Sequence, residues 1–178
     1  MTPGSITPAT AGQTIGPFWH LLEDKSWADL TRFGVPGEPI VLTGRVVDGD
    51  GAPFADGCVE IWQADPPLSE LFPGFGRCGI DRAGEFRFKT LKPGPLPGRG
   101  NACQAPHIAI CIHGRGLMRH LHTRAYFANE TLNETDPLLN SIEAPSRRAT
   151  LIARPDGSHV WRLDIRLQGG EETVFLDI

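Results

Sequence analysis

The feature that most constrains the fold is a strict alternation of apolar and polar residues in short segments from residue 40 onward. In residues 160–169 (VWRLDIRLQG), large apolar side chains occupy every second position and charged side chains fill most of the positions between them. A period of two is that of a β-strand with one buried face. The same pattern, or a short apolar run bounded by turn residues, recurs in residues 40–51, 58–64, 84–90, 106–113, 120–127 and 172–178. Seven such strands predict an all-β fold, and we expect an antiparallel β-sandwich.

Turn residues separate the predicted strands. The chain has 178 residues, of which 21 are Gly and 16 are Pro, and its hydrophobic fraction is an ordinary 40%. Gly and Pro spread through such a chain indicate many turns rather than disorder. One helical turn is expected at 137–143, because Asp136 is a good N-cap and Pro137 a good first helical residue.

Residues 1–39 are irregular and form an N-terminal arm ahead of a β-sandwich domain at 40–178. A single short helix is expected in the arm, with Ser26 as its cap. The arm is too apolar to be a solvated tail. Its large apolar side chains are Ile15, Phe18, Trp19, Leu21, Leu22 and Trp27.

Charge and cysteine content exclude several functional classes. With 17 basic and 21 acidic side chains, a net charge of −4 and no basic run, nucleic acid is not an expected partner. The first thirteen residues have neither a basic start nor an apolar segment, and no apolar run is long enough to span a membrane, so a cytoplasmic location is expected. Cys58, Cys78, Cys103 and Cys111 show no CxxC pairing and are expected to be free thiols.

Four of the six histidines lie within residues 107–122. His120 and His122 share one face of a predicted strand, so their imidazoles could hold one metal ion. No third ligand stands at a suitable spacing, and we therefore interpret the pair as structural histidines. His107 and His113 would share a face but lie roughly 20 Å apart on an unbroken strand. They cannot bind one ion together.

Eight segments carry a more specific pattern, because they occur in a fixed order over nearly the whole chain. They are QTIGPFWH, LTGRVVDGDG, VEIWQAD, GRCGIDRAGEFRFKTLKPG, APHIAI, HLHTRAYF, RRATLIA and RLDIRLQGGEETVFLDI. In this order they resemble the intradiol ring-cleaving dioxygenases, and within that family the protocatechuate-cleaving branch built from alpha and beta subunits. The resemblance implies a role in O2-dependent cleavage of 3,4-dihydroxybenzoate to 3-carboxy-cis,cis-muconate.

The resemblance also implies Fe(III) held by two tyrosinates and two histidines, and this chain departs from that ligand set. The family's H-I-H pattern reads His107-Ile108-Ala109, and its K-P-G-P-Y segment ends in Leu96. No tyrosine follows Ala64, and the chain's single tyrosine is Tyr126. Two tyrosinate ligands need two tyrosines. We therefore expect no metal in this chain, His107 as a relic of the ligand set, and Fe(III) in a partner beta subunit.

The family's arginine ahead of the histidine pattern is also replaced, by Gln104. The resemblance implies that an alpha subunit, which holds no iron, forms part of the substrate pocket. The matching residues are Thr14, Gly16 and Pro17 in the arm and Arg124 in HLHTRAYF. A guanidinium suits the carboxylate of the substrate, whereas Gly and Pro offer a compact wall against its ring.

Two alternatives remain open from the sequence. One is a metal-free β-sandwich binding module, which the arm and the last strands make less suitable. The other is a stand-alone dioxygenase with an unusual metal site built on His120 and His122.

Overall fold

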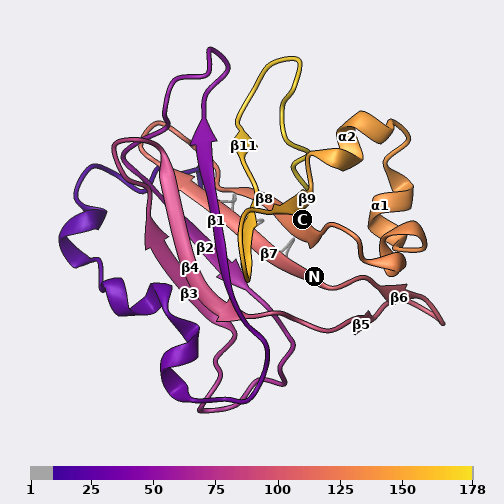
Figure 1. The fold of residues 1–178 in the computed structure, drawn as a ribbon. Coiled ribbons are helices and arrows are strands. Elements are labelled where there is room, and N and C mark those ends of the chain that lie inside the picture. The colour runs from indigo at the N-terminus through magenta and orange to yellow at the C-terminus, as the bar shows by residue number, and fades with distance from the viewer. Residues whose placement is uncertain (1–9, 178) are drawn as a thin grey trace, which may run out of the picture.

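The computed structural model describes residues 10–177, and these form a curled, mostly β structure with few helices (Figure 1). Within the described residues, nine strands make one mixed sheet in the order β11-β1-β10-β9-β8-β7-β2-β3, with β4 paired to β1. They are β1 (Pro39–Val47), β2 (Gly57–Trp62), β3 (Phe75–Gly79), β4 (Glu85–Leu91), β7 (His107–Gly114), β8 (Leu121–Phe127), β9 (Ile152–Pro155), β10 (Val160–Arg162) and β11 (Ile165–Arg166). A separate hairpin pairs β5 (Leu96–Pro97) with β6 (Cys103–Gln104).

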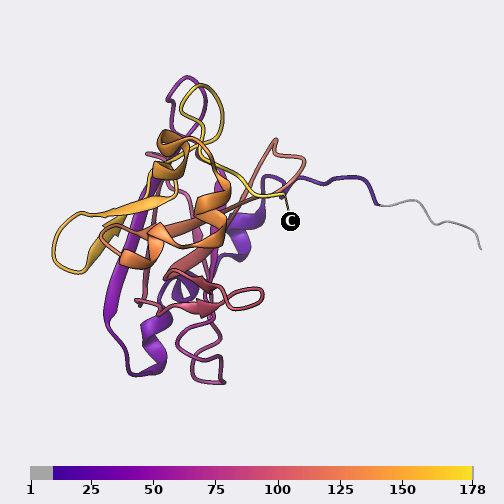
Figure 2. The same cartoon turned by 90° about the vertical axis from the view of Figure 1, so that its right-hand side faces the viewer.

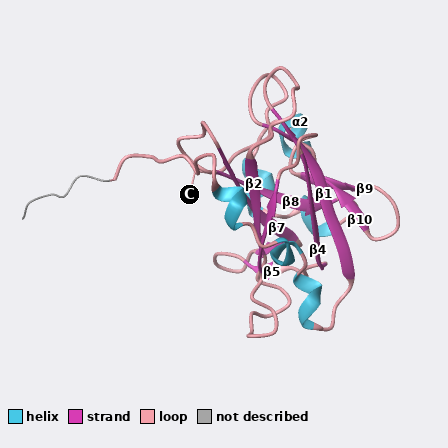
Figure 3. Ribbon diagram, turned by 90° about the vertical axis from the view of Figure 1, so that its left-hand side faces the viewer, coloured by secondary structure: helices cyan, strands magenta, loops and turns pink. Residues whose placement is uncertain are grey.

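The helical segments are short and lie around the sheet (Figure 3). They are the 3-10 turns η1 (Trp19–Leu22), η2 (Lys25–Ala28), η3 (Leu30–Phe33) and η4 (Thr131–Glu134) and the helices α1 (Pro137–Ser141) and α2 (Pro145–Ala149). The predicted N-cap of α1 is confirmed, since the Asp136 carboxylate accepts from the N–H groups of Leu138 and Leu139. The predicted cap at Ser26 is wrong, because Asp24 caps η2 and Ser26 lies inside it. No helix among the described residues has the length and apolar character to cross a membrane.

The all-β prediction is confirmed, but the expected antiparallel sandwich is not. β1 pairs in parallel with β10 and β11, and β8 pairs in parallel with β9. Parallel neighbours need a long crossover, and the segment from 128 to 151 supplies one between β8 and β9. The result is one curled mixed sheet.

Four strands, β3, β5, β6 and β9, lay outside the predicted set, and two predicted strands are altered. β3 (FGRCG) is rich in glycine and β9 (IARP) is short, so neither shows an alternating pattern. The predicted strand at 160–169 is divided into β10 and β11, whereas residues 172–177 make only an isolated bridge from Leu176 to His122.

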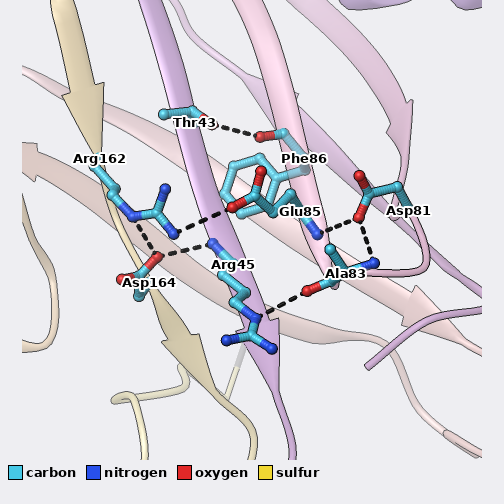
Figure 4. A network of polar contacts seen from close by, with 8 residues as sticks. All are labelled: Thr43, Arg45, Asp81, Ala83, Glu85, Phe86, Arg162 and Asp164. Carbon is cyan, nitrogen blue, oxygen red and sulfur yellow. Dashed lines mark hydrogen bonds and ion pairs between the residues drawn. The ribbon is translucent and has the colours of Figure 1, made fainter. Parts of the chain in front are cut away.

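A polar network holds the break between β10 and β11 (Figure 4). The Asp164 carboxylate accepts from the backbone N–H of Arg45 on β1 at 2.9 Å and pairs with the Arg162 guanidinium at 2.9 Å. Arg162 also lies 3.6 Å from Glu85 on β4. These contacts connect β10 and β11 to β1 and β4 at the point where the backbone hydrogen bonds between β1 and the C-terminal strands are interrupted.

The concave interior of the sheet holds the main core, and a smaller core lies on the outer face. Phe86 and Phe88 of β4 face Ile61, Ile110 and other apolar residues inside the sheet. On the outer face, Tyr126 is buried under α1 and its neighbours with Ala105, Leu139 and Leu151.

The N-terminal arm runs along the side of the sheet opposite α1 and α2 (Figure 1). Leu30 is 2% exposed and belongs to the main core. Glu23 accepts a hydrogen bond from the N–H of Gly79 on β3 at 2.7 Å. Ahead of η1 the chain extends away from the body, beside the β7–β8 loop (Figure 2). Phe18 and Leu21 remain 70% and 71% exposed.

Candidate functional site

A row of histidine, cysteine, arginine and tyrosine side chains lies on the outer face of β2, β7 and β8. Antiparallel register places Tyr126 opposite His107, Arg124 opposite Ala109, and His122 opposite Cys111. Directly opposed residues of an antiparallel pair project to the same side of the sheet. The pairing therefore makes one continuous polar row from the small outer core toward the arm.

Arg124 is fixed at the edge of the small outer core. Its Nη1 donates to Gln104 Oε1 at 2.9 Å and to the Tyr126 hydroxyl at 3.1 Å. Gln104 is itself held, because its Nε2 donates to the carbonyl of Pro97. Among the described residues no carboxylate pairs with the Arg124 guanidinium. This oriented positive charge suits an anionic group brought from outside the chain.

The Tyr126 hydroxyl extends this network inward. It donates to the fully buried Asp136 carboxylate at 3.1 Å, and that carboxylate also accepts from the N–H of Ala105 at 2.8 Å. Burial raises the pKa of Tyr126 well above its usual value. The only tyrosine of the chain is therefore a neutral hydrogen-bonding group.

The arm residues expected to line a pocket lie apart from Arg124 within this chain. The Thr14 hydroxyl donates to the carbonyl of Gly114 at 2.9 Å and accepts from the N–H of Gly116 at 3.0 Å. It therefore fastens the arm to the β7–β8 loop. Gly114 stands five residues along β7 from Ala109, the partner of Arg124, which is about 17 Å.

Gly16 and Pro17 lie just beyond that anchor. Gly16 has φ +77, and no heavy atom lies within 4 Å of the position a Cβ would take. Pro17 is exposed. A single chain thus presents two separate surfaces, one at Thr14, Gly16 and Pro17 and one at Arg124.

A cluster of thiol, imidazole and carboxylate groups lies between those two surfaces. Ligand atoms of Cys111, His120 and His122 lie within 4.8 Å of one another, and so do those of Glu60, Cys111 and His113. The expectation that His120 and His122 lack a third neighbour is therefore wrong. Cys111 stands on another strand, and only the β7–β8 register, which pairs residues 111 and 122, could have revealed it.

Hydrogen bonds order one half of this cluster. His113 Nε2 lies 3.3 Å from Cys111 Sγ and 3.1 Å from Glu60 Oε2. The contact with Cys111, followed by that with Glu60, raises the pKa of His113 to about 9. The hydrogen bond from His113, aided by Arg77, lowers the pKa of Glu60 to about 2.

Comparison with known proteins identifies the family. A family model described as a dioxygenase matches residues 22–169. The protocatechuate 3,4-dioxygenase alpha chain of Pseudomonas putida is 40% identical, over 98% of this chain and 99% of that one. This chain belongs to the intradiol dioxygenase family.

Other members of the family agree. The corresponding alpha chain of Burkholderia cepacia is 37% identical over 95% of this chain and 97% of its own length, and the beta chain of the same enzyme is 32% identical over 93% and 78%. Among solved structures, the dioxygenase domain of a carbohydrate-binding fusion protein from Streptomyces sp. SirexAA-E has a TM-score of 0.63 at 22% identity, covering 98% of this chain and 96% of that one. An intradiol ring-cleavage dioxygenase from Tetranychus urticae has a TM-score of 0.61 at 20% identity, covering 90% and 94%. These structures support the fold.

Intradiol dioxygenases generally use Fe(III), and the matching positions of this chain do not fit that ion. Ala109 and Leu96 offer no ligand atom. The segment after Ala64 has Asp65, whose carboxylate accepts from the N–H of Gly94 at 2.7 Å. His107 alone remains, 7% exposed, with Nδ1 2.7 Å from the carbonyl of Ala105 and with its pKa lowered by burial. One buried imidazole cannot hold Fe(III), which prefers several oxygen donors.

Proposed function

We propose that this chain is the non-iron alpha subunit of a protocatechuate 3,4-dioxygenase and that it forms part of the substrate pocket against a beta subunit that holds Fe(III). The assembly cleaves 3,4-dihydroxybenzoate with O2 to give 3-carboxy-cis,cis-muconate. The observation that carries the proposal is the full-length similarity to alpha chains combined with the loss of ligand atoms at Ala109 and Leu96. The similarity to a beta chain supports an alpha–beta assembly.

The contribution of this chain is to bind and orient the substrate. Arg124 meets the substrate carboxylate, because its guanidinium is held in place by Gln104 and Tyr126 and has no acidic partner among the described residues. Thr14, Gly16 and Pro17 line the pocket from the arm, where Gly and Pro form a compact wall against a substrate ring. Since Arg124 and the arm lie apart in one chain, each surface meets the partner separately. Correct orientation removes much of the entropic barrier to reaction, and the oxidation itself belongs to the iron of the partner.

The test compares the chain expressed alone with the chain co-expressed with its beta subunit. Alone, it should be colourless, hold no stoichiometric iron and cleave no protocatechuate. Together, the two chains should purify as a complex with about one iron per alpha–beta pair and full ring-cleaving activity. Iron analysis, the visible spectrum and product formation are the measurements.

Two outcomes would contradict the proposal. A coloured chain with about one iron of its own and activity without a partner would indicate a stand-alone dioxygenase. If the chain does not co-purify with the beta subunit and does not alter the ring-cleaving activity of that subunit, the chain would be a separate binding module.

A further inference from the structure

We propose that Cys111, His120 and His122 form a surface binding site for a soft or borderline transition-metal ion, with Zn2+ as its natural test ion. The site differs from the position at which the family holds Fe(III), and the inference does not depend on the proposed function. If this proposal is correct, the expected absence of a metal in this chain applies only to the position at which the family holds Fe(III).

The first support is that two ligands come from neighbouring strands and the third from the loop just before one of them. Cys111 on β7 and His122 on β8 are directly opposed, so their side chains leave the same face of the sheet. His120 stands two residues before His122, and the two rings lie 4.6 Å apart between centroids. The backbone of His122 is fixed on its other side, where its carbonyl accepts from the N–H of Leu176 at 2.8 Å. Two of the three ligands therefore sit on rigid strands.

The second support is the distance between ligand atoms. All three lie within 4.8 Å of one another without a metal ion. Tetrahedral zinc, with Zn–S of about 2.3 Å and Zn–N of about 2.0–2.1 Å, needs separations of roughly 3.4–3.6 Å. A shift of roughly 1 Å closes that difference. His120 can make it, because this residue is exposed and lies in the loop before β8.

The third support is the chemistry of the donors. One thiolate and two imidazoles are typical of Zn2+ or copper sites and unsuited to Fe(III), which prefers anionic oxygen. A fourth position can be taken by water, as in open zinc sites. Glu60 and Arg77 lie beside the site, where they would position neighbouring side chains but would not bind the ion.

The site is reachable from solvent. A hollow of about 300 Å3 on the outer face is lined by Trp62, Phe75, Cys111 and His122 among others. A bound ion would tie His120, at the end of the β7–β8 loop, to the sheet. The same loop holds Thr14 of the arm through Gly114 and Gly116. Metal binding would therefore stabilise the loop on which the arm is fastened.

The experiment measures zinc binding to the full-length chain, in complex with its beta subunit where one binds. After treatment with a chelator, Zn2+ is titrated in competition with a chromophoric chelator, and Co2+ is used to detect thiolate ligation by its near-ultraviolet charge-transfer absorption. Wild type should bind one Zn2+ per chain. Removal of a ligand should weaken binding at least as much as the roughly 10–100-fold seen for loss of an orienting partner.

The variants are chosen so that a folding defect cannot hide the result. Cys111→Ser should abolish the cobalt charge-transfer band, and His120→Gln should weaken zinc binding while leaving the fold intact, because His120 is exposed. Cys103→Ser and His159→Asn are matched controls outside the cluster and should bind as wild type does.

The proposal is overturned if wild type binds no Zn2+ more tightly than Cys111→Ser does, or if binding survives both Cys111→Ser and His120→Gln. Zinc affinity and ring-cleaving activity are separate readouts, so failure here is distinguishable from failure of the proposed function.

Discussion

At the scale of single residues, one buried carboxylate organises the surroundings of Arg124. Asp136 caps α1, accepts from the N–H of Ala105 and accepts from the Tyr126 hydroxyl. Tyr126 in turn accepts from Arg124. A buried carboxylate with several donors is costly to replace, because each donor would lose its partner. The position of the Arg124 guanidinium is therefore set by the packing of α1 against β8.

Replacing Arg124 tests its proposed contact with substrate. Two unit charges about 4 Å apart at an effective dielectric constant of about 20 attract by about 4 kcal/mol, and desolvation reduces this to roughly 1.5–3 kcal/mol. Arg124→Ala in the assembled enzyme should thus lower kcat/KM for protocatechuate about 10- to 150-fold. Catechol, which has no carboxylate, should lose much less, and the iron content should not change. Steady-state kinetics with both substrates are the measurement.

The exposed Arg82 in the β3–β4 turn provides the matched control, and Arg82→Ala should leave both substrates unaffected. Equal losses for protocatechuate and catechol in Arg124→Ala would assign Arg124 to the interface or the fold instead of the pocket.

His107 predicts how stability depends on pH. Burial is the main cause of its lowered pKa, and the nearby Arg124 charge adds to it, whereas the Ala105 carbonyl and Asp136 oppose it. The unfolded chain therefore takes up a proton near the ordinary value of 6.5 while folded His107 stays neutral. This contribution to stability is fully present above pH 6.5 and is lost as the pH falls toward the folded pKa. The loss should be at most about 1.4 kcal/mol per pH unit.

The variant His107→Asn keeps a donor for the Ala105 carbonyl but cannot be protonated in this range. Its free energy of unfolding, measured with urea between pH 7 and pH 5, should fall less steeply than that of wild type. His159→Asn, at an exposed position, should follow wild type. Parallel curves for wild type and His107→Asn would show that His107 is not the cause.

At the scale of elements, β1 is the strand on which the sheet depends. It pairs with β4 along seven positions and with β10 and β11 on its other edge. Gly44 lies at the crossing, where a Cβ would come within 1.8 Å of the Leu163 carbonyl oxygen and 2.8 Å of Phe86. Only glycine permits this approach. It arises because β10 ends at Arg162 and the chain turns at Leu163 toward β1.

Gly44→Ala should accordingly destabilise the protein by about 3 kcal/mol or more, because a buried methyl group would overlap backbone that cannot move freely. Urea unfolding followed by circular dichroism measures the change, or the soluble yield does so if the variant does not fold. Gly170→Ala is the matched control, since no heavy atom lies within 4 Å of the position that a Cβ would take there. A Gly44→Ala protein within about 0.5 kcal/mol of wild type would contradict the close approach at Leu163.

At the scale of the whole molecule, the arm divides into a part that packs on its own sheet and a part that does not. Residues around η2 and η3 lie on β3 and β4, and Leu30 joins the main core. Phe18 and Leu21 in and beside η1 are largely exposed. Exposed apolar groups of this size next to Gly16 and Pro17 suit burial by a partner.

Limited proteolysis with chymotrypsin tests this division. The chain alone should be cut early at Phe18 or Leu21, whereas the complex with the beta subunit should be protected there. Leu68 and Leu71, exposed in the loop between β2 and β3, serve as internal reference sites. If the isolated chain resists cleavage in the arm as well as the complex does, the arm does not need the partner.

The sequence alone was sufficient for the features that depend on local chemistry. Alternation identified most of the sheet, Asp136 and Pro137 identified the start of α1, and the absence of paired cysteine motifs indicated thiols that are all free in the structure. The motifs in order indicated the family, which the comparisons show. The residues Ala109 and Leu96 offer no ligand atom and predict that this chain does not hold the iron. Each of these depends on residues close together in the chain or on residue type.

Tertiary structure decided whatever depends on which strands meet. The parallel pairing of β8 with β9 and of β1 with β10 arises from a crossover that no local pattern reveals. The separation of Thr14 from Arg124, and the approach of Cys111 to His122, follow from the register of β7 on β8. A shift of one residue in that register would turn these side chains to opposite faces. The register is set by burial of the apolar face of both strands, which is a property of the folded core.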